Sequence, residues 1–242
     1  MSLRRIFVVA RLTGVELARR RVALGLLTAL PLAFYGSQVS RGSDAVITGG
    51  VAMAFSIAGA SIFVALTARP VDPRLILAGY HPFELLLGRL LLLELLGILV
   101  TGCFSVIMVF GSSPAHPWAL AAGVALVALT SVPFGLAVGG VSPHELEGVL
   151  VMIGVVGVQL TLYSTDLAAK FLPFWGGQRL LDHSVNQVPA SAAVPANIAY
   201  AATLFAIATY VMTRRAPAVG GARRHSRAVL TAAAARAVRS TR

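Results

Sequence analysis

Long apolar runs separated by short polar segments dominate the chain. Uncharged runs of about 20 residues recur, and each is long enough to cross a hydrocarbon core about 30 Å thick. Transmembrane β-strands would instead give segments of about ten residues with alternating polarity. We therefore predict an all-α membrane protein, with residues 1–213 as a single transmembrane domain. The six predicted spans are residues 22–40, 45–68, 85–110, 118–141, 146–165 and 189–213.

Polar segments flank the spans at both chain ends. Residues 2–21 carry Leu3, Ile6 and Phe7 on one side of a predicted helix and several arginines on the other. This pattern is typical of an amphipathic helix that lies in the membrane interface. The alternative is a cytoplasmic extension that only orients the first span. Residues 214–242 form a basic tail, and anionic lipid is favoured over nucleic acid as the partner of its arginines.

The largest internal polar interruption is residues 69–89, called the hinge segment below. It holds five charged residues and three prolines. Asp72 before Pro73 predicts the start of a short helix, with Asp72 as its cap and Pro73 at its first position. The sequence Gly-Tyr-His-Pro at residues 79–82 would end that helix. A short helix along the membrane surface could bind a groove on a soluble partner, whereas the alternative is an ordinary loop.

Charge and composition set the orientation of this chain. Hydrophobic residues make up 57% of the sequence, charged residues only 12%, and the net charge is +11. Six basic residues precede the first span, three lie in the hinge segment, and eight follow the last span. Only Arg41, Lys170 and Arg179 fall on the opposite side. The excess of basic residues places both termini and the hinge segment in the cytoplasm, and the expected location is the cell membrane of a bacterium.

Residues that could carry chemistry are scattered along the chain. His81, His116, His144 and His183 lie in four different connections, so we predict no metal site. The sequence has no His-Glu-x-x-His, no Gly-x-Ser-x-Gly, and no Gly-rich loop followed by Lys and Ser or Thr. We therefore predict no catalytic residue, and any ATP that the protein uses would be bound by another chain. Cys103 is the only cysteine, which excludes a disulfide within the chain.

Two polar residues lie inside the predicted spans. Glu94 carries a charge that is costly to bury in a bilayer. In one interpretation it contacts substrate or protons. In the other, which is favoured, it pairs with Arg89 or faces water. Gln159 is more typical of a hydrogen bond between helices than of a substrate ligand. Together with Phe34 and Phe55, these two residues form the candidate substrate path.

The order of these elements resembles the permease subunits of type-2 ABC exporters. That family has a basic interfacial helix, six spans, and a cytoplasmic connection between the second and third spans. The connection has a Leu-rich turn, a break, and a Leu-Leu-Leu-Gly-Lys/Arg-Leu run. Here residues 72–90 read Asp-Pro-Arg-Leu-Ile-Leu-Ala-Gly-Tyr-His-Pro-Phe-Glu-Leu-Leu-Leu-Gly-Arg-Leu. Residues 170–181 match the short re-entrant helices that the family has between its fifth and sixth spans.

Two departures from the family pattern stand out. The Glu often found early in the family's hinge is absent, and Arg69 and Asp72 stand there instead. The chain also has no large external domain, which argues against the macrolide-type exporters.

The resemblance implies a dimer of two permease chains, identical or different, with two cytoplasmic ATPase subunits that bind ATP and Mg. The hinge helix would be the coupling helix that contacts the ATPase. A hydrophobic or amphipathic cargo, such as a drug, a lipid or a lipid-linked molecule, would pass between spans 1, 2 and 5 of the two protomers. The chain would not be an enzyme by itself, and membrane lipid would surround it. The expected ATPase contacts are Asp72, Pro73, Arg74, Leu75, Ile76, Leu77, Tyr80 and His81.

Two other functions stay open at this point. A non-transporting membrane scaffold or immunity-type factor predicts a hinge segment without a partner. An intramembrane enzyme predicts that one change at Glu94 or at a histidine abolishes function without loss of assembly. A neighbouring reading frame that encodes a Walker A motif would favour the exporter.

Overall fold

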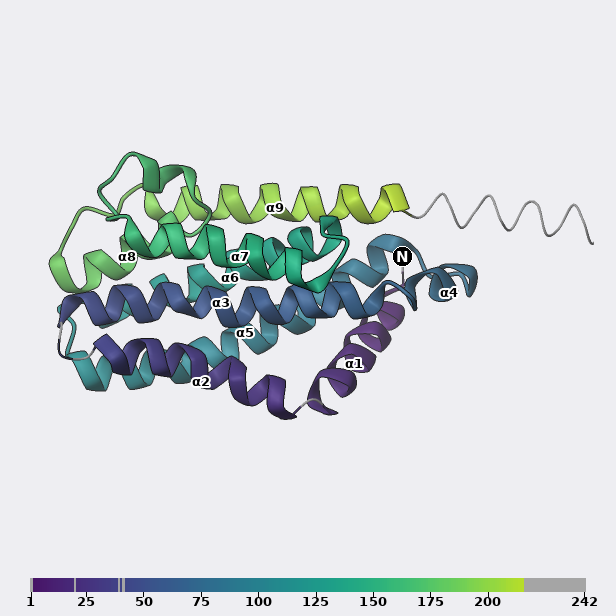
Figure 1. Cartoon of the computed structure of the whole chain (residues 1–242), viewed down its shortest axis with the longest axis horizontal. Helices are drawn as coiled ribbons and strands as arrows, with labels where there is room; N and C mark the ends of the chain where they lie inside the picture. Colours follow the sequence, from purple (N-terminus) through teal and green to yellow (C-terminus); the bar gives the residue numbers. More distant parts are fainter. Residues whose placement is uncertain (1, 20, 39, 41, 216–242) are drawn as a thin grey trace, which may run out of the picture.

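The computed structural model describes residues 2–19, 21–38, 40 and 42–215, and this part of the chain contains helices and no strand. The predicted basic tail lies, from residue 216 onward, outside the described residues. The long helices run side by side in an elongated bundle, and the N-terminal helix lies oblique to them (Figure 1). In chain order they are α1 (Leu3–Arg19), α2 (Arg21–Gln38), α3 (Ser43–Ala68), α4 (Asp72–Leu77), α5 (Pro82–Ser112), α6 (Pro117–Val141), α7 (Glu145–Thr161), the 3₁₀ turn η2 (Ala168–Phe171), α8 (Trp175–Asn186) and α9 (Ala193–Arg215).

Helices α3 and α6 form the centre of the bundle. Most of their residues are buried, and small residues allow the two backbones to approach closely. A Cβ atom added to Gly139 of α6 would lie 2.9 Å from the carbonyl oxygen of Ile62 on α3. Gly135 meets the carbonyl of Ala58 in the same way. Small residues at such contacts let apolar helices associate through close van der Waals packing.

Four of the described helices are long and apolar enough to cross a membrane: Ser43–Ala68, Pro82–Ser112, Pro117–Val141 and Ala193–Arg214. These helices indicate a membrane protein. A helix also covers much of each of the other two predicted spans, but α2 has 18 residues and α7 only 17. At 1.5 Å per residue, a helix of that length reaches about 26 Å, which is short of a typical hydrocarbon core. The count of six spans therefore stays a prediction.

The outer surface of the bundle is strongly apolar. Leu95 and Leu99 on α5 are 66% and 65% exposed, and Leu150 on α7 is 58% exposed. Continuous apolar surface of this kind is unusual for a monomeric protein in water, whereas lipid tails would cover it without cost. The exposed side chains therefore agree with the apolar composition of the helices.

Different elements lie at the two ends of the bundle (Figure 1). The α4 end holds α4, the start of α1 and the end of α9. The α8 end holds α8, η2 and the connections that lead into α6 and α9. The short helices predicted between the fifth and sixth spans thus correspond to η2 and α8. Their insertion into a membrane surface stays a prediction.

The predicted N-terminal helix forms, but it presents a different face to the protein than expected. Ile6, Val9 and Leu17 are the buried residues of α1, and α1 packs mainly on α5. Leu3 and Phe7, which we expected on the same face as Ile6, are 86% and 72% exposed. The helix is apolar over a wider arc than one neighbour can cover. Part of that arc therefore contacts the protein and part is left for another apolar surface.

Candidate functional site

The hinge segment folds into a short helix followed by a sharp break. Gly79 has a φ of 95°, a conformation that glycine adopts at low cost. The N–H of Tyr80 donates to the carbonyl of Leu75 at 3.1 Å, and the N–H of Gly79 donates to Ile76 at 3.0 Å. These two bonds form a Schellman motif that ends α4. The predicted helix and its Gly-Pro break are therefore confirmed.

A capping box marks the start of α5. The Nδ1 atom of His81 accepts from the N–H of Phe83 at 3.3 Å, and a Glu84 carboxylate oxygen accepts from the N–H of His81 at 3.1 Å. Pro82 occupies the first turn, where its missing N–H costs nothing. α5 therefore begins at Pro82, three residues before the predicted start of the third span.

Asp72 joins α4 to α5 instead of capping α4, so the predicted capping role is wrong. No side-chain hydrogen bond caps α4, whose N-cap is Val71. The carboxylate of Asp72 forms a two-point ion pair with Arg89, in which Nη1 lies 3.0 Å from Oδ2 and Nη2 contacts Oδ1. Paired guanidinium and carboxylate groups match each other in shape. Of the two alternatives favoured for Glu94, a pair with Arg89 or exposure to water, the pair is wrong, because Asp72 is the partner of Arg89.

The start of α1 is fastened to the break between α4 and α5. One oxygen of Glu84 accepts from the backbone N–H of Ser2 at 2.8 Å. Arg5 donates to the carbonyl of Gly79 at 2.7 Å, approaches Glu84 to 3.8 Å, and lies 5.5 Å from the ring centre of Tyr80. These contacts link residues more than 70 positions apart in the sequence. Sequence reasoning missed them, because it considered only an interfacial helix or a cytoplasmic extension that orients the first span.

The predicted partner contacts on α4 and in the break after it divide into two groups by exposure. Arg74, Leu77 and His81 are exposed, with Leu77 at 45%. The other predicted contacts are only partly exposed: Asp72, Pro73, Leu75, Ile76 and Tyr80. None of the residues of α4 is buried. The surface open to a partner is therefore narrower than the sequence suggested and centres on Arg74 and Leu77.

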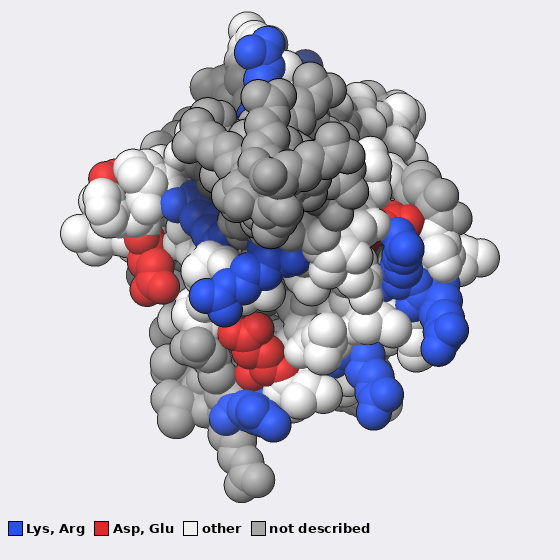
Figure 2. All heavy atoms as spheres, turned by 90° about the vertical axis from the view of Figure 1, so that its right-hand side faces the viewer, with Lys and Arg blue, Asp and Glu red and all other residues white. Residues whose placement is uncertain are grey.

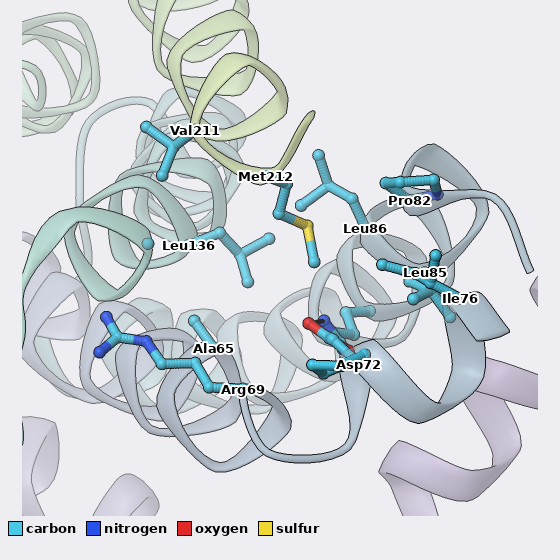
Figure 3. A pocket seen from close by; sticks show the side chains of 13 residues that line it. Ala65, Arg69, Asp72, Ile76, Pro82, Leu85, Leu86, Leu136, Val211 and Met212 are labelled. Atoms are coloured by element: carbon cyan, nitrogen blue, oxygen red, sulfur yellow. Dashed lines mark hydrogen bonds and ion pairs between the residues drawn. The ribbon is translucent and has the colours of Figure 1, made fainter. Parts of the chain in front are cut away.

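Cavities lie on both sides of α4. A cavity of about 250 Å³ separates it from the ends of α6 and α9, and Ile76, Asp72 and Met212 point toward it (Figure 3). A smaller cavity of about 120 Å³ lies between α4, α1 and α3, with Leu75 in its wall. Arg89 lines both cavities. Its ion pair with Asp72 therefore crosses a loosely packed region and fixes α4 to the bundle.

Arg69 closes the same end of the bundle from the side of α3. Its guanidinium donates to the carbonyl of Pro143 at 3.0 Å and also to the carbonyls of Gly139 and Ser142. These carbonyls follow the last turn of α6 or belong to it, where a helix lacks intrahelical donors and carries partial negative charge. Figure 2 looks onto this end of the molecule and shows basic and acidic side chains on its described surface.

The candidate substrate-path residues do not form one group. Phe34 of α2 and Phe55 of α3 stack with ring centres 5.9 Å apart. Gln159 is fully buried and donates to Gln178 of α8, which agrees with a hydrogen bond between helices. Glu94 is half-buried on α5 and makes no hydrogen bond or ion pair with the described residues. A role for these residues in a substrate path stays a prediction.

Histidines of two connections meet at the α8 end. The rings of His116 and His183 stack with centres 5.0 Å apart. His183 also contacts the carbonyl of Val188 through Nδ1 at 2.9 Å. In the described part of the chain, no three His, Cys, Asp or Glu side chains gather in a way that could hold a metal ion.

The chemistry of the α4 end is thus that of a contact surface. Its described residues offer an exposed basic and apolar helix face, an ion pair behind that face, and apolar cavities beside it. No protein-family model matches this sequence, and a comparison with curated proteins finds no match.

Proposed function

We propose that the chain is the transmembrane subunit of an ATP-driven exporter for a hydrophobic or amphipathic cargo. In this proposal α4 is the contact for a separate ATPase subunit, which binds ATP and Mg. Two copies of the ATPase would serve two transmembrane chains, and the chain described here would not hydrolyse ATP itself. Drugs, lipids and lipid-linked molecules are the cargo classes that suit its apolar helices.

The observation that carries the proposal is the way α4 is mounted. It lies between two helices that are long and apolar enough to cross a membrane. Its outward face presents Arg74 and Leu77, and its inner side is joined to α5 by the Asp72–Arg89 ion pair. A partner that moves α4 would therefore pull on α5 through a short, directional contact.

The cavities beside α4 support a moving role. Packed interiors resist displacement because each side chain contacts many neighbours. α4 instead has no buried residue and borders two cavities. It can shift relative to the bundle while the ion pair and the attached start of α1 keep it connected.

Site-specific photo-crosslinking tests the proposal in the organism that encodes the chain. A photoreactive phenylalanine analogue replaces Leu77 in the tagged full-length protein, and azido-ATP then labels the crosslinked product. We expect a product that carries the azido-ATP label. Leu146, which is 70% exposed in the first turn of α7, is the matched control position and should give no such product.

A second measurement ties the contact to function. The ATPase rate of the purified complex should fall in the Leu77→Asp variant and stay unchanged in Leu146→Asp. Crosslinks from Leu77 that never carry the nucleotide label would refute the exporter proposal and favour a scaffold. An ATPase rate that is equally insensitive to both substitutions would refute coupling through α4.

A further inference from the structure

The α8 end contains a polar cavity that the exporter proposal does not use. Its volume is about 370 Å³, and it lies where α2 ends, α3 begins, and α7 passes into the connection toward α8. Its walls include Asp44 and Thr48 of α3, and Ser164 of the connection. Helix α8 contributes a polar stripe of residues spaced four apart, Gln178, Asp182 and Asn186. This spacing puts all three on one face of the helix.

The polar groups of this cavity are held in place from behind. Ser164 donates from its hydroxyl to one oxygen of Asp182, and Asn186 donates to the other oxygen at 2.8 Å. Gln178 donates to the carbonyl of Leu162 at 2.7 Å. Trp175 in turn donates from Nε1 to the carbonyl of Ser164 at 2.8 Å. Side chains fixed by such bonds present a ready-made set of donors and acceptors to a ligand.

The described walls of the cavity carry negative charge. They hold the carboxylates of Asp44 and Asp182, and none of the described residues that line the cavity is Lys or Arg. Arg179 of α8 bonds instead to the carbonyl of Pro189 at 2.9 Å and to the hydroxyl of Ser164 at 3.2 Å. Among the described residues, Asp182 therefore has hydrogen-bond donors but no ion-pair partner.

A buried carboxylate without a counter-charge is the feature that points to a ligand. Asp182 is only 8% exposed, and taking such a charge out of water is costly unless a cation or further donors compensate it. An ionised carboxylate has about four acceptor positions, of which Asp182 uses two with described residues. The remaining positions are available to a donor in the cavity.

From this arrangement we infer that the cavity binds a small organic cation that also carries hydroxyl groups. The ammonium group would pair with Asp182, and hydroxyls would exchange hydrogen bonds with the neutral amides and hydroxyls of the walls. An anion would meet two carboxylates, and an apolar ligand would leave the remaining acceptor positions of Asp182 without a donor. The inference does not depend on an ATPase or on transport.

Tryptophan fluorescence provides a direct readout, because the chain has only two tryptophans. Trp118→Phe leaves Trp175 as the single reporter, one hydrogen bond behind the cavity wall. The full-length variant is purified in detergent and titrated with glucosamine, glucose and gluconate, which share a size but differ in charge. We expect a saturable change with glucosamine, affinity for glucose lower by about tenfold or more, and no response to gluconate.

Substitutions in the same background identify the carboxylate. Asp182→Asn should weaken glucosamine binding by about tenfold or more, the loss expected for one charge-assisted hydrogen bond. Asp44→Asn keeps the buried network intact and should weaken it less. Glu147→Gln at the α4 end is the matched control and should bind like its parent.

Several results would overturn the inference. Equal affinity for glucose and glucosamine would refute recognition of a cation. A Trp175 signal that never saturates would show that the cavity is not a binding site. If Asp182→Asn fails to fold, Asp44→Asn decides: binding unchanged from the parent would then exclude recognition by the negative walls.

Discussion

Breaking the ion pair between Asp72 and Arg89 is the sharpest test of how α4 is held. In Asp72→Asn the guanidinium of Arg89 stays in place without a carboxylate, and its side chain is only 5% exposed. Removing one partner of a buried pair costs about 3–5 kcal/mol. We take the lower end, about 3 kcal/mol, because Asp72 is 17% exposed and Arg89 borders two cavities that water could enter.

This energy should appear as displacement of α4. When α4 leaves the bundle, Arg89 regains water, so the variant recovers the lost free energy only in the open state. At 1.4 kcal/mol for each factor of ten, about 3 kcal/mol raises the open fraction by roughly a hundredfold. Such a change is large compared with the fewfold differences that ordinary surface substitutions give.

Cysteine labelling measures the open fraction. Leu75 is partly buried against the cavity beside α1 and α3, so a maleimide should reach Leu75→Cys mainly when α4 is displaced. The assay uses Cys103→Ala, because Cys103 is the only native cysteine. We expect Asp72→Asn to speed labelling by roughly a hundredfold. Arg74→Gln, an exposed change on the same helix, is the control and should leave the rate within a factor of a few.

A double variant separates the effect of losing the ion pair from the effect of leaving the Arg89 charge unpaired. Asp72→Asn combined with Arg89→Met leaves no unpaired guanidinium behind α4 and should label more slowly than Asp72→Asn alone. A labelling rate of Asp72→Asn equal to that of its parent would refute the reasoning, because the ion pair would then not hold α4 in place.

Three further predictions concern packing, attachment and orientation. Gly135→Ala should destabilise the protein by about 1–3 kcal/mol, because the added Cβ would meet the backbone of α3. Gly102→Ala, whose Cβ would have nothing within 4 Å, should be neutral or slightly stabilising. Thermal unfolding in detergent measures both, and equal shifts in melting temperature would contradict the close packing of α6 on α3. Glu84→Gln removes the charge that receives the start of α1 and should speed hydrogen exchange of the first turn of α1, measured by mass spectrometry. In a cysteine-free background, an impermeant maleimide should label Arg74→Cys and Tyr163→Cys from opposite faces of sealed vesicles, and labelling from one face would exclude this orientation of the bundle.

Local patterns in the sequence located the elements of the hinge segment. Pro73 and the Gly-Tyr-His-Pro break at residues 79–82 act through backbone geometry: proline fixes φ and removes a donor, and glycine tolerates positive φ. Their effects reach only a turn or so along the chain, and the short helix with its break is therefore predictable. The capping box of His81 and Glu84 was not predicted, because the usual sequence signature has Ser, Thr, Asp or Asn at the cap position.

The partners of charged side chains were not predictable in the same way. Asp72 fits a helix cap by its position and by its proline neighbour, yet it binds Arg89 seventeen residues away. Glu94 lies closer to Arg89 in the sequence, but no hydrogen bond or ion pair joins them in the described chain. Several acidic residues lie near enough to Arg89 in the sequence to pair with it, and only the packing of α4 on α5 decides which carboxylate reaches the guanidinium.

The sequence by itself determined the apolar helical class, the positions of the helices and the break in the hinge segment, because these depend on hydrophobic runs and on backbone restrictions of single residues. Tertiary structure alone decided that Ser2 and Arg5 fasten α1 to the hinge segment, and that Asp44 and Asp182 share a cavity. Burial, charge compensation and cavity shape depend on helices that are distant in sequence. No local pattern contains that information, so it arises only when the helices pack together.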